Sequence, residues 1–166
     1  MEGTTTVNAG ARELQARFED FVRPHRDAMW LLASRLVGPD RREDLVQEAL
    51  ETAWRRFSTY DHTRSGPRTW LLVVVADRCR KARRTTRLTW PLTDRAQQAP
   101  DLDLMLDVGR AVARLPRRQR LAVELFYVLD LPVADVAAVM GCTVGTVSST
   151  LSDARRSLRT QLEVTA

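Results

Sequence analysis

Two stretches of opposite charge hold the side chains best suited to binding chemistry. The run RCRKARRTTR at 78–87 has six cations in ten residues and no acid. Such a run can neutralise phosphates and give salt-dependent affinity for a nucleic acid, although a solvated charged face is the common alternative. Just before it, Arg64, Arg68 and Trp70 place cations and a ring beside a Gly-Pro loop, which suits unpaired bases. For Trp70 alone, a core position is the more ordinary interpretation.

The acidic stretch lies between Asp40 and Glu51, where five acids stand against two arginines. Asp44, Gln47, Glu48 and Glu51 fall on neighbouring turns of one predicted helix. An acidic face would repel DNA, so the pattern favours a basic protein partner, with an ordinary exposed helix face as the alternative.

A third candidate is the segment MGCTVGTVSSTLSDARRSL at 140–158, which is typical of the second half of a helix-turn-helix. Ala137 is small enough for two helices to approach, Gly141 suits the tight turn, and Val147 can lock the second helix. The three-four spacing predicts a buried stripe of Val144, Val147, Leu151, Ala154 and Leu158. The predicted outward face is Ser148, Ser149, Ser152, Asp153, Arg155, Arg156 and Arg159. A packed helical hairpin that binds no DNA is the alternative.

Other kinds of site find little support in the sequence. His25 and His62 are far apart, and neither has a nucleophile or carboxylate cluster nearby, so we expect no enzyme. Cys79 and Cys142 lack metal-ligand or disulfide spacing, and no cofactor or metal is predicted; Cys142 is expected to be a small buried group. The net charge of +5 favours a polyanionic partner. The N-terminal residues have an early acid and no apolar core, which does not fit a secretory signal, and the longest strongly apolar run, Trp70 to Ala76, is too short to span a bilayer. With the two widely spaced cysteines, this predicts a cytoplasmic protein without membrane insertion.

The elements that position these residues are predicted to be helices throughout, because apolar residues recur at helical and not at strand spacing. The fold class is therefore all-α. In the first half we expect a helix over 12–22 ended or kinked by Pro24, a second reaching Leu36, a third opened by an Asp40 capping box, and a fourth over 70–84. The apolar side of the third is predicted as Leu45, Ala49, Leu50, Ala53, Trp54 and Phe57. Four more helices follow before Leu162, with Pro116 and Pro132 near helix starts. Two small helical domains, 11–86 and 101–164, joined by a flexible linker over 87–100, are the expected organisation.

With these pieces in this order, the chain resembles the extracytoplasmic-function (ECF) sigma factors, the promoter-specificity subunits of bacterial RNA polymerase. In the first half, DLVQEAL followed by AWRRF carries the resemblance most specifically, and GPRTWLLVVVADR is similar to the next family segment. In the second half, LPRRQRLAVELFYVLDLPVADVAAVMGCTVGTVSSTLSDARRSLR is similar to the promoter-reading end. The resemblance covers nearly all of residues 12 to 162.

The resemblance implies a role for each candidate group. The DLVQE helix of the family docks on the coiled-coil clamp of the largest polymerase subunit, which assigns core-polymerase binding to Asp44, Leu45, Gln47, Glu48 and Glu51. The next loop and helix hold the −10 element and capture a flipped base, a role that falls to Arg64, Arg68, Trp70, Arg78, Arg80 and Lys81. The helix-turn-helix reads the −35 duplex, a role that falls to Thr143, Thr146, Ser148, Ser149, Ser152, Arg155 and Arg156.

Some positions depart from the family pattern. The family usually carries basic residues where this chain has Ser148, Thr150 and Asp153, and Asp77 stands where an arginine is common. Each lost bidentate arginine contact to guanine removes about 1–3 kcal/mol of discrimination, so weakened −35 reading is expected. A degenerate sigma-like adaptor that selects no promoter, and a plain helix-turn-helix repressor, are the alternative functions. The family also implies an anti-sigma factor as a partner.

Overall fold

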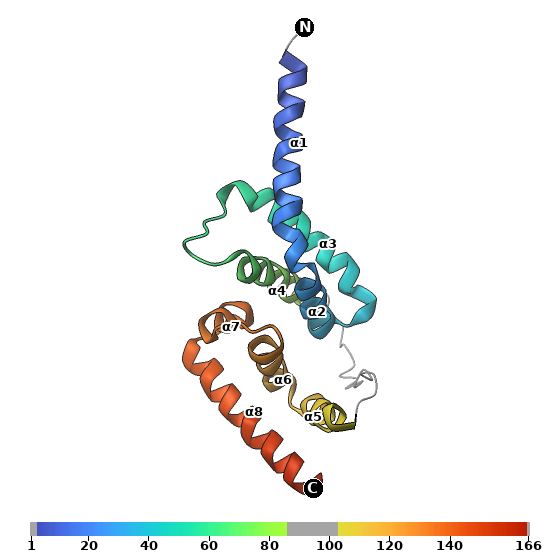
Figure 1. The fold of residues 1–166 in the computed structure, drawn as a ribbon, viewed down its shortest axis with the longest axis vertical. Coiled ribbons are helices and arrows are strands. Elements are labelled where there is room, and N and C mark those ends of the chain that lie inside the picture. The colour runs from blue at the N-terminus through green and yellow to red at the C-terminus, as the bar shows by residue number, and fades with distance from the viewer. Residues whose placement is uncertain (1–2, 86–102, 166) are drawn as a thin grey trace. The chain divides into compact units, whose positions relative to one another are not determined.

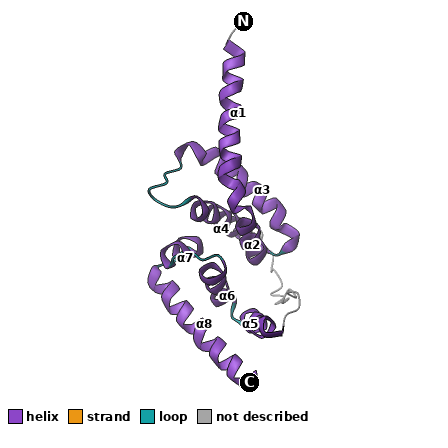
Figure 2. Cartoon of the chain, in the orientation of Figure 1, coloured by secondary structure: helices purple, strands orange, loops and turns teal. Residues whose placement is uncertain are grey.

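The computed structural model describes residues 3–85 and 103–165, and every regular element in these ranges is a helix (Figures 1 and 2). The all-α prediction is therefore confirmed. The chain divides into two compact units, Met1–Thr86 and Arg87–Ala166. The predicted linker over 87–100 lies outside the described residues.

The helices of the first unit follow one another with short connections. They are α1 (Gly3–Val22), a 3-10 turn η1 (Arg23–His25), α2 (Arg26–Val37), α3 (Pro39–Arg56), a 3-10 turn η2 (Phe57–Thr59) and α4 (Pro67–Thr85). As predicted, the first helix ends ahead of Pro24. It begins at Gly3, however, and not near residue 12, and its turns over residues 10–17 are exposed and project past the rest of the unit (Figure 1).

The start of α3 differs from the predicted capping box, which is wrong. Gly38, with φ 84°, precedes the helix, and Pro39 takes its first position. Proline suits that position because its missing N–H would have no helical partner there. Asp40 consequently lies inside the first turn, and no side-chain cap forms.

The core of the first unit lies where α2, α3 and α4 pack against one another. Its fully buried side chains are Met29, Leu32, Ala33, Leu45, Ala49, Ala53, Leu71, Leu72 and Val75. On α3 the buried residues are Leu45, Val46, Ala49 and Ala53, and the two alanines let a neighbouring helix approach closely. Trp54, predicted on this apolar side, is 38% exposed, with its ring edge-on to Phe18.

The second unit is built around its last helix. Its elements are α5 (Asp103–Arg114), α6 (Arg117–Val123), a π-helical turn η3 (Glu124–Val128), α7 (Val133–Met140) and α8 (Val144–Thr165). Pro116 and Pro132 stand directly before α6 and α7, as predicted. The helix α8 packs against α5, α6 and α7.

The predicted buried stripe of α8 is only partly correct. Val147, Leu151 and Ala154 are at most 2% exposed, and Leu158 is half-buried. Val144 is 50% exposed, because it opens the helix at the turn, ahead of the residues that pack. Cys142, in that turn, is half-buried and not buried as expected.

Candidate functional site

A groove between α2 and α3 is lined by two of the five acids of the acidic stretch, Glu43 and Asp44. Its volume is about 400 Å³, and Arg26, Met29, Trp30, Glu43, Asp44, Val46, Gln47 and Leu50 line it. Asp44 and Gln47, both exposed, stand on its rim, and the exposed Glu51 lies one turn further along α3. An apolar floor with an acidic rim can receive a helix that carries apolar and basic side chains.

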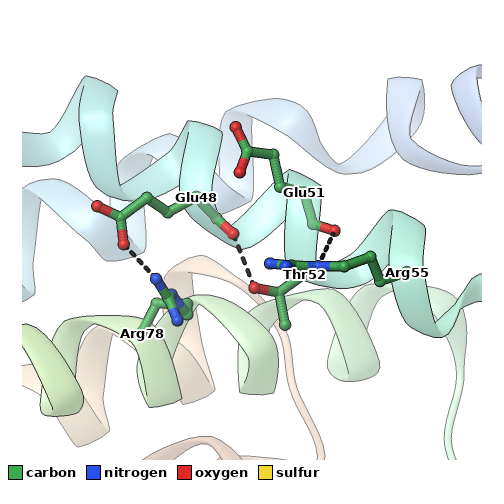
Figure 3. A network of polar contacts seen from close by, with 5 residues as sticks. All are labelled: Glu48, Glu51, Thr52, Arg55 and Arg78. Atoms are coloured by element: carbon green, nitrogen blue, oxygen red, sulfur yellow. Dashed lines mark hydrogen bonds and ion pairs between the residues drawn. The ribbon is translucent and has the colours of Figure 1, made fainter.

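Two residues assigned to polymerase binding do not face outward with the others. Leu45 is 1% exposed in the core of the unit, so its assignment to a binding surface is wrong. Its helical spacing is that of the buried stripe. Glu48 is half-exposed and directed toward α4, where its carboxylate accepts a hydrogen bond from the guanidinium of Arg78 (Figure 3).

The loop between η2 and α4 is held by a set of short-range hydrogen bonds. The Asp61 carboxylate accepts from the backbone N–H of Thr63 at 2.9 Å and from its hydroxyl at 2.6 Å. These two bonds hold the pKa of Asp61 below its ordinary value. The Tyr60 hydroxyl donates to the carbonyl of Ser65 at 2.8 Å, across the loop. His62 and Arg64 are consequently presented, exposed, on a formed loop.

An aromatic cluster packs at the base of this loop. Tyr60 lies between Phe21 and Trp70, with ring centroids 5.0 Å from each. Phe57 and Phe18 extend the cluster toward α1. Trp70 is half-buried in it, which agrees with the core interpretation and leaves little of the ring for a base to stack on.

The predicted −10 cations differ in their surroundings. Arg64 is exposed, whereas Arg68 is half-buried near His25. Burial and the Arg68 cation lower the pKa of His25. Arg80 pairs with Asp77 on its own helix. Lys81 is exposed on the next position of α4.

The turn between α7 and α8 has the geometry expected of a helix-turn-helix. Gly141 takes a left-handed conformation with φ 66°. Its N–H donates to the Ala138 carbonyl, and the Cys142 N–H donates to the Ala137 carbonyl, which together close α7 in a Schellman motif. Thr143 then caps α8 by accepting from the Thr146 N–H at 3.2 Å. Thr143 and Thr146 thus serve the helix start, with their hydroxyls 2.9 Å apart.

The predicted outward face of α8 is exposed as expected, but its polar groups are engaged within the unit. The Ser148 hydroxyl donates to the Val144 carbonyl at 3.1 Å, and the Ser149 hydroxyl donates to the Thr146 carbonyl at 3.0 Å. Ser152 is exposed as well. Such back-bonding leaves serine hydroxyls as weak, adaptable contacts rather than specific readers.

Two of the three arginines of this face, Arg155 and Arg156, also have partners. Arg156 pairs with Asp153, at 3.2 Å. Arg155 donates through Nε to the Tyr127 hydroxyl at 2.9 Å, and its guanidinium lies 5.9 Å from the centre of that ring.

Sequence reasoning missed Tyr60 and Tyr127. A tyrosine beside a Gly-Pro loop could have signalled Tyr60. No local pattern signals Tyr127, because its partner Arg155 is 28 residues away.

Over the described ranges, 3–85 and 103–165, no group of three or more His, Cys, Asp or Glu side chains could hold a metal ion. In the same ranges no single helix has the length and apolarity to cross a membrane. By length and composition alone, α7 and α8 would pass that test together as a pair bent by 100°.

Comparisons with known proteins place both units. The family model of sigma-70 region 2 matches residues 21–89, and that of sigma-70 region 4 matches residues 105–158. The chain is 34% identical to the ECF RNA polymerase sigma factor SigC of Mycobacterium tuberculosis, over 98% of this chain and 92% of that protein. It is 31% identical to the RNA polymerase sigma-E factor of Streptomyces coelicolor, over 87% of this chain and 85% of that one.

Two solved structures are similar as well. One is the sigma factor RpoE in complex with the anti-sigma factor NepR from Bartonella quintana. It has a TM-score of 0.66 and 28% identity, covering 89% of this chain and 98% of that one. The other is CnrH in complex with the cytosolic domain of CnrY, with a TM-score of 0.63. At 23% identity over 92% of this chain and 91% of that one, it supports the fold alone.

Proposed function

The chain belongs to the ECF sigma factors, which direct promoter recognition by bacterial RNA polymerase, and we propose how its surfaces divide that work. As a sigma factor it is a transcription initiation factor and not an enzyme. Residues 11–86, within the first unit, bind core polymerase and the −10 element. Residues 101–164, within the second unit, bind the −35 element, and residues 87–100 connect the two.

Core polymerase docks on the groove between α2 and α3. The observation that carries this assignment is the acidic rim above an apolar floor, with Asp44, Gln47 and Glu51 exposed along one helix. Such a surface complements a basic, amphipathic partner such as the coiled-coil clamp that the family binds.

The docking assignment is tested by reversing charge on the rim. Asp44→Arg should reduce retention of the full-length chain by immobilised bacterial core polymerase by tenfold or more, with helical circular dichroism unchanged. The matched control is Glu13→Arg, an exposed carboxylate on α1 away from the groove. Equal retention of the Asp44 variant and the control would refute the assignment.

The −10 element meets the loop over 61–66 and the cationic side of α4. The loop is formed in advance by the Asp61 and Tyr60 hydrogen bonds, and Arg64 is exposed on it. A preformed loop lowers the ordering cost of holding a flipped base. Arg64, Arg68, Arg80 and Lys81 supply cations for the nearby phosphates.

The −35 duplex meets α8 through Ser148, Ser149, Ser152, Arg155 and Arg156, with Thr143 and Thr146 at its start. Because serine is an adaptable contact and both arginines begin in internal contacts, this reading is weak in sequence discrimination. Run-off transcription by the reconstituted holoenzyme, on templates selected from a random library, tests this division of labour. The selected templates should share a well-defined −10 element and a less restricted −35 element.

An anti-sigma factor that binds this chain is the further partner we propose, since RpoE of Bartonella quintana was solved with its anti-sigma factor. We also propose a cytoplasmic location, because the chain acts together with RNA polymerase. Co-purification of polymerase and of an anti-sigma factor with this chain from the native cell tests both proposals.

A further inference from the structure

One ion pair joins the two helices to which the polymerase and the −10 element are assigned. Glu48 of α3 and Arg78 of α4 stand 30 residues apart in the chain, and their carboxylate and guanidinium are in contact (Figure 3). The Arg78 side chain is 26% exposed and that of Glu48 is 46% exposed. The resemblance to the family assigns Glu48 to polymerase binding and Arg78 to DNA binding.

The other three side chains drawn in Figure 3 do not contact the Glu48 carboxylate or the Arg78 guanidinium. Figure 3 shows the Glu51 carboxylate directed away from α4. Thr52 donates its hydroxyl to the backbone carbonyl of Glu48 at 2.9 Å, and Arg55 donates to the backbone carbonyl of Glu51 at 3.3 Å. The Nε atom of Arg78 is buried and has no hydrogen-bond partner, so this part of the side chain lies against protein rather than in solvent.

The surrounding packing gives this pair a structural task. The buried stripe of α3 carries Leu45, Ala49 and Ala53, and the two residues that follow Leu45 on it are small. The two alanines permit close approach but offer few interlocking atoms, so along this part of α3 apolar packing fixes the register of two helices only weakly. A directional, charge-assisted hydrogen bond fixes that register. Buried polar contacts specify the register of helices in this way in other proteins.

We propose that Arg78 is a positioning residue. It holds α4 in register on α3 through Glu48 and contacts neither DNA nor polymerase. The proposal rests on the proposed function, in which α3 docks the polymerase and α4 meets the −10 element. The positions of the α4 cations then depend on the Glu48 carboxylate of α3, and that carboxylate contacts no nucleic acid.

The test uses the full-length chain with bacterial core polymerase and a template selected by the wild-type holoenzyme. Arg78→Gln, Glu48→Gln, the reversals R78E and E48R, and the double reversal are compared. Arg64→Gln serves as the phosphate-contact control, and Arg55→Gln as a surface arginine bonded to its own helix. Three quantities are measured: template concentration at half-maximal transcription, its salt dependence, and retention on core polymerase.

If Arg78 is a positioning residue, R78Q and E48Q should each raise the half-maximal template concentration by roughly 2- to 5-fold, the range of partly exposed ion pairs. Their combination should be no worse than either alone, and the double reversal should restore most of the loss. Polymerase retention of R78Q should not change, and neither should the slope of log affinity against log salt for R78Q and E48Q. R64Q should reduce that slope by about 0.7–0.9, the value of one phosphate.

Two results would overturn the proposal. A slope reduced by R78Q as much as by R64Q would mean that Arg78 neutralises a phosphate. A double reversal as poor as R78E alone would mean that the pair is not the unit of action. If instead R64Q leaves the slope unchanged, the assignment of this surface to the −10 element is refuted, but the role of the Glu48–Arg78 pair is not. Thermal unfolding of the free chain then tests the pair alone, because R78Q and E48Q must lower the Tm non-additively if the two residues act together.

Discussion

Tyr60→Phe isolates the hydrogen bond that crosses the proposed −10 loop. The substitution keeps the ring contacts with Phe21 and Trp70 and removes only the hydroxyl that donates to the Ser65 carbonyl at 2.8 Å. A part-buried neutral hydrogen bond contributes about 0.5–1.5 kcal/mol. A loss of about 1 kcal/mol corresponds to roughly a 5-fold smaller equilibrium constant for forming the loop.

The expected consequence is a promoter-opening defect with an intact fold. If −10 binding requires the formed loop, the apparent affinity of the holoenzyme for a selected promoter should fall by at most about 5-fold. A 2-aminopurine base in the non-template strand of the −10 element reports opening through its fluorescence. The Tm of the chain should change by only a few degrees.

A second variant separates the hydrogen bond from the cluster. Tyr60→Leu removes the ring as well, so it should lower the Tm further than Tyr60→Phe. Asp61→Asn keeps an oxygen acceptor for the Thr63 N–H and should resemble the wild type in opening, whereas Asp61→Ala should not. Unchanged opening by Tyr60→Phe, with the −10 element still required, would refute the idea that this bond prepares the loop.

Three further predictions concern other parts of the chain. Leu151→Ala, at a position 2% exposed in the second unit, should cost about 2–5 kcal/mol in the free energy of unfolding, measured by urea denaturation; a loss under 1 kcal/mol would contradict the packing of α8. Ser148→Arg should sharpen the −35 preference among selected templates, and an unchanged template pool would place Ser148 outside the DNA contact. The pKa of His25 is lowered in the folded chain, so its contribution to stability is complete above pH 6.5 and is lost as pH falls from 6.5 through the lower folded value. His25→Gln should therefore flatten this part of the stability profile, and a profile that Gln leaves unchanged would assign it to other groups.

Much of the architecture followed from local pattern. The helices, their interruption ahead of Pro24, and the starts after Pro116 and Pro132 depend on interactions within one or two turns. The same applies to the outward serine face of α8, because exposure on a packed helix follows its periodicity. Errors occurred at helix ends, as at Gly38 and Val144, where the geometry of the turn competes with periodicity.

What the sequence by itself determined was the order of segments and the family to which the chain belongs, since both are carried by residue types at fixed short spacings. The tertiary structure alone decided which charges meet. Arg78 lies in a basic run and Glu48 in an acidic helix, and either pattern alone indicates an external partner. They pair with each other because α3 and α4 cross where both side chains emerge, and Arg155 finds Tyr127 for the same reason. Such contacts depend on how helices pack, which no local spacing encodes.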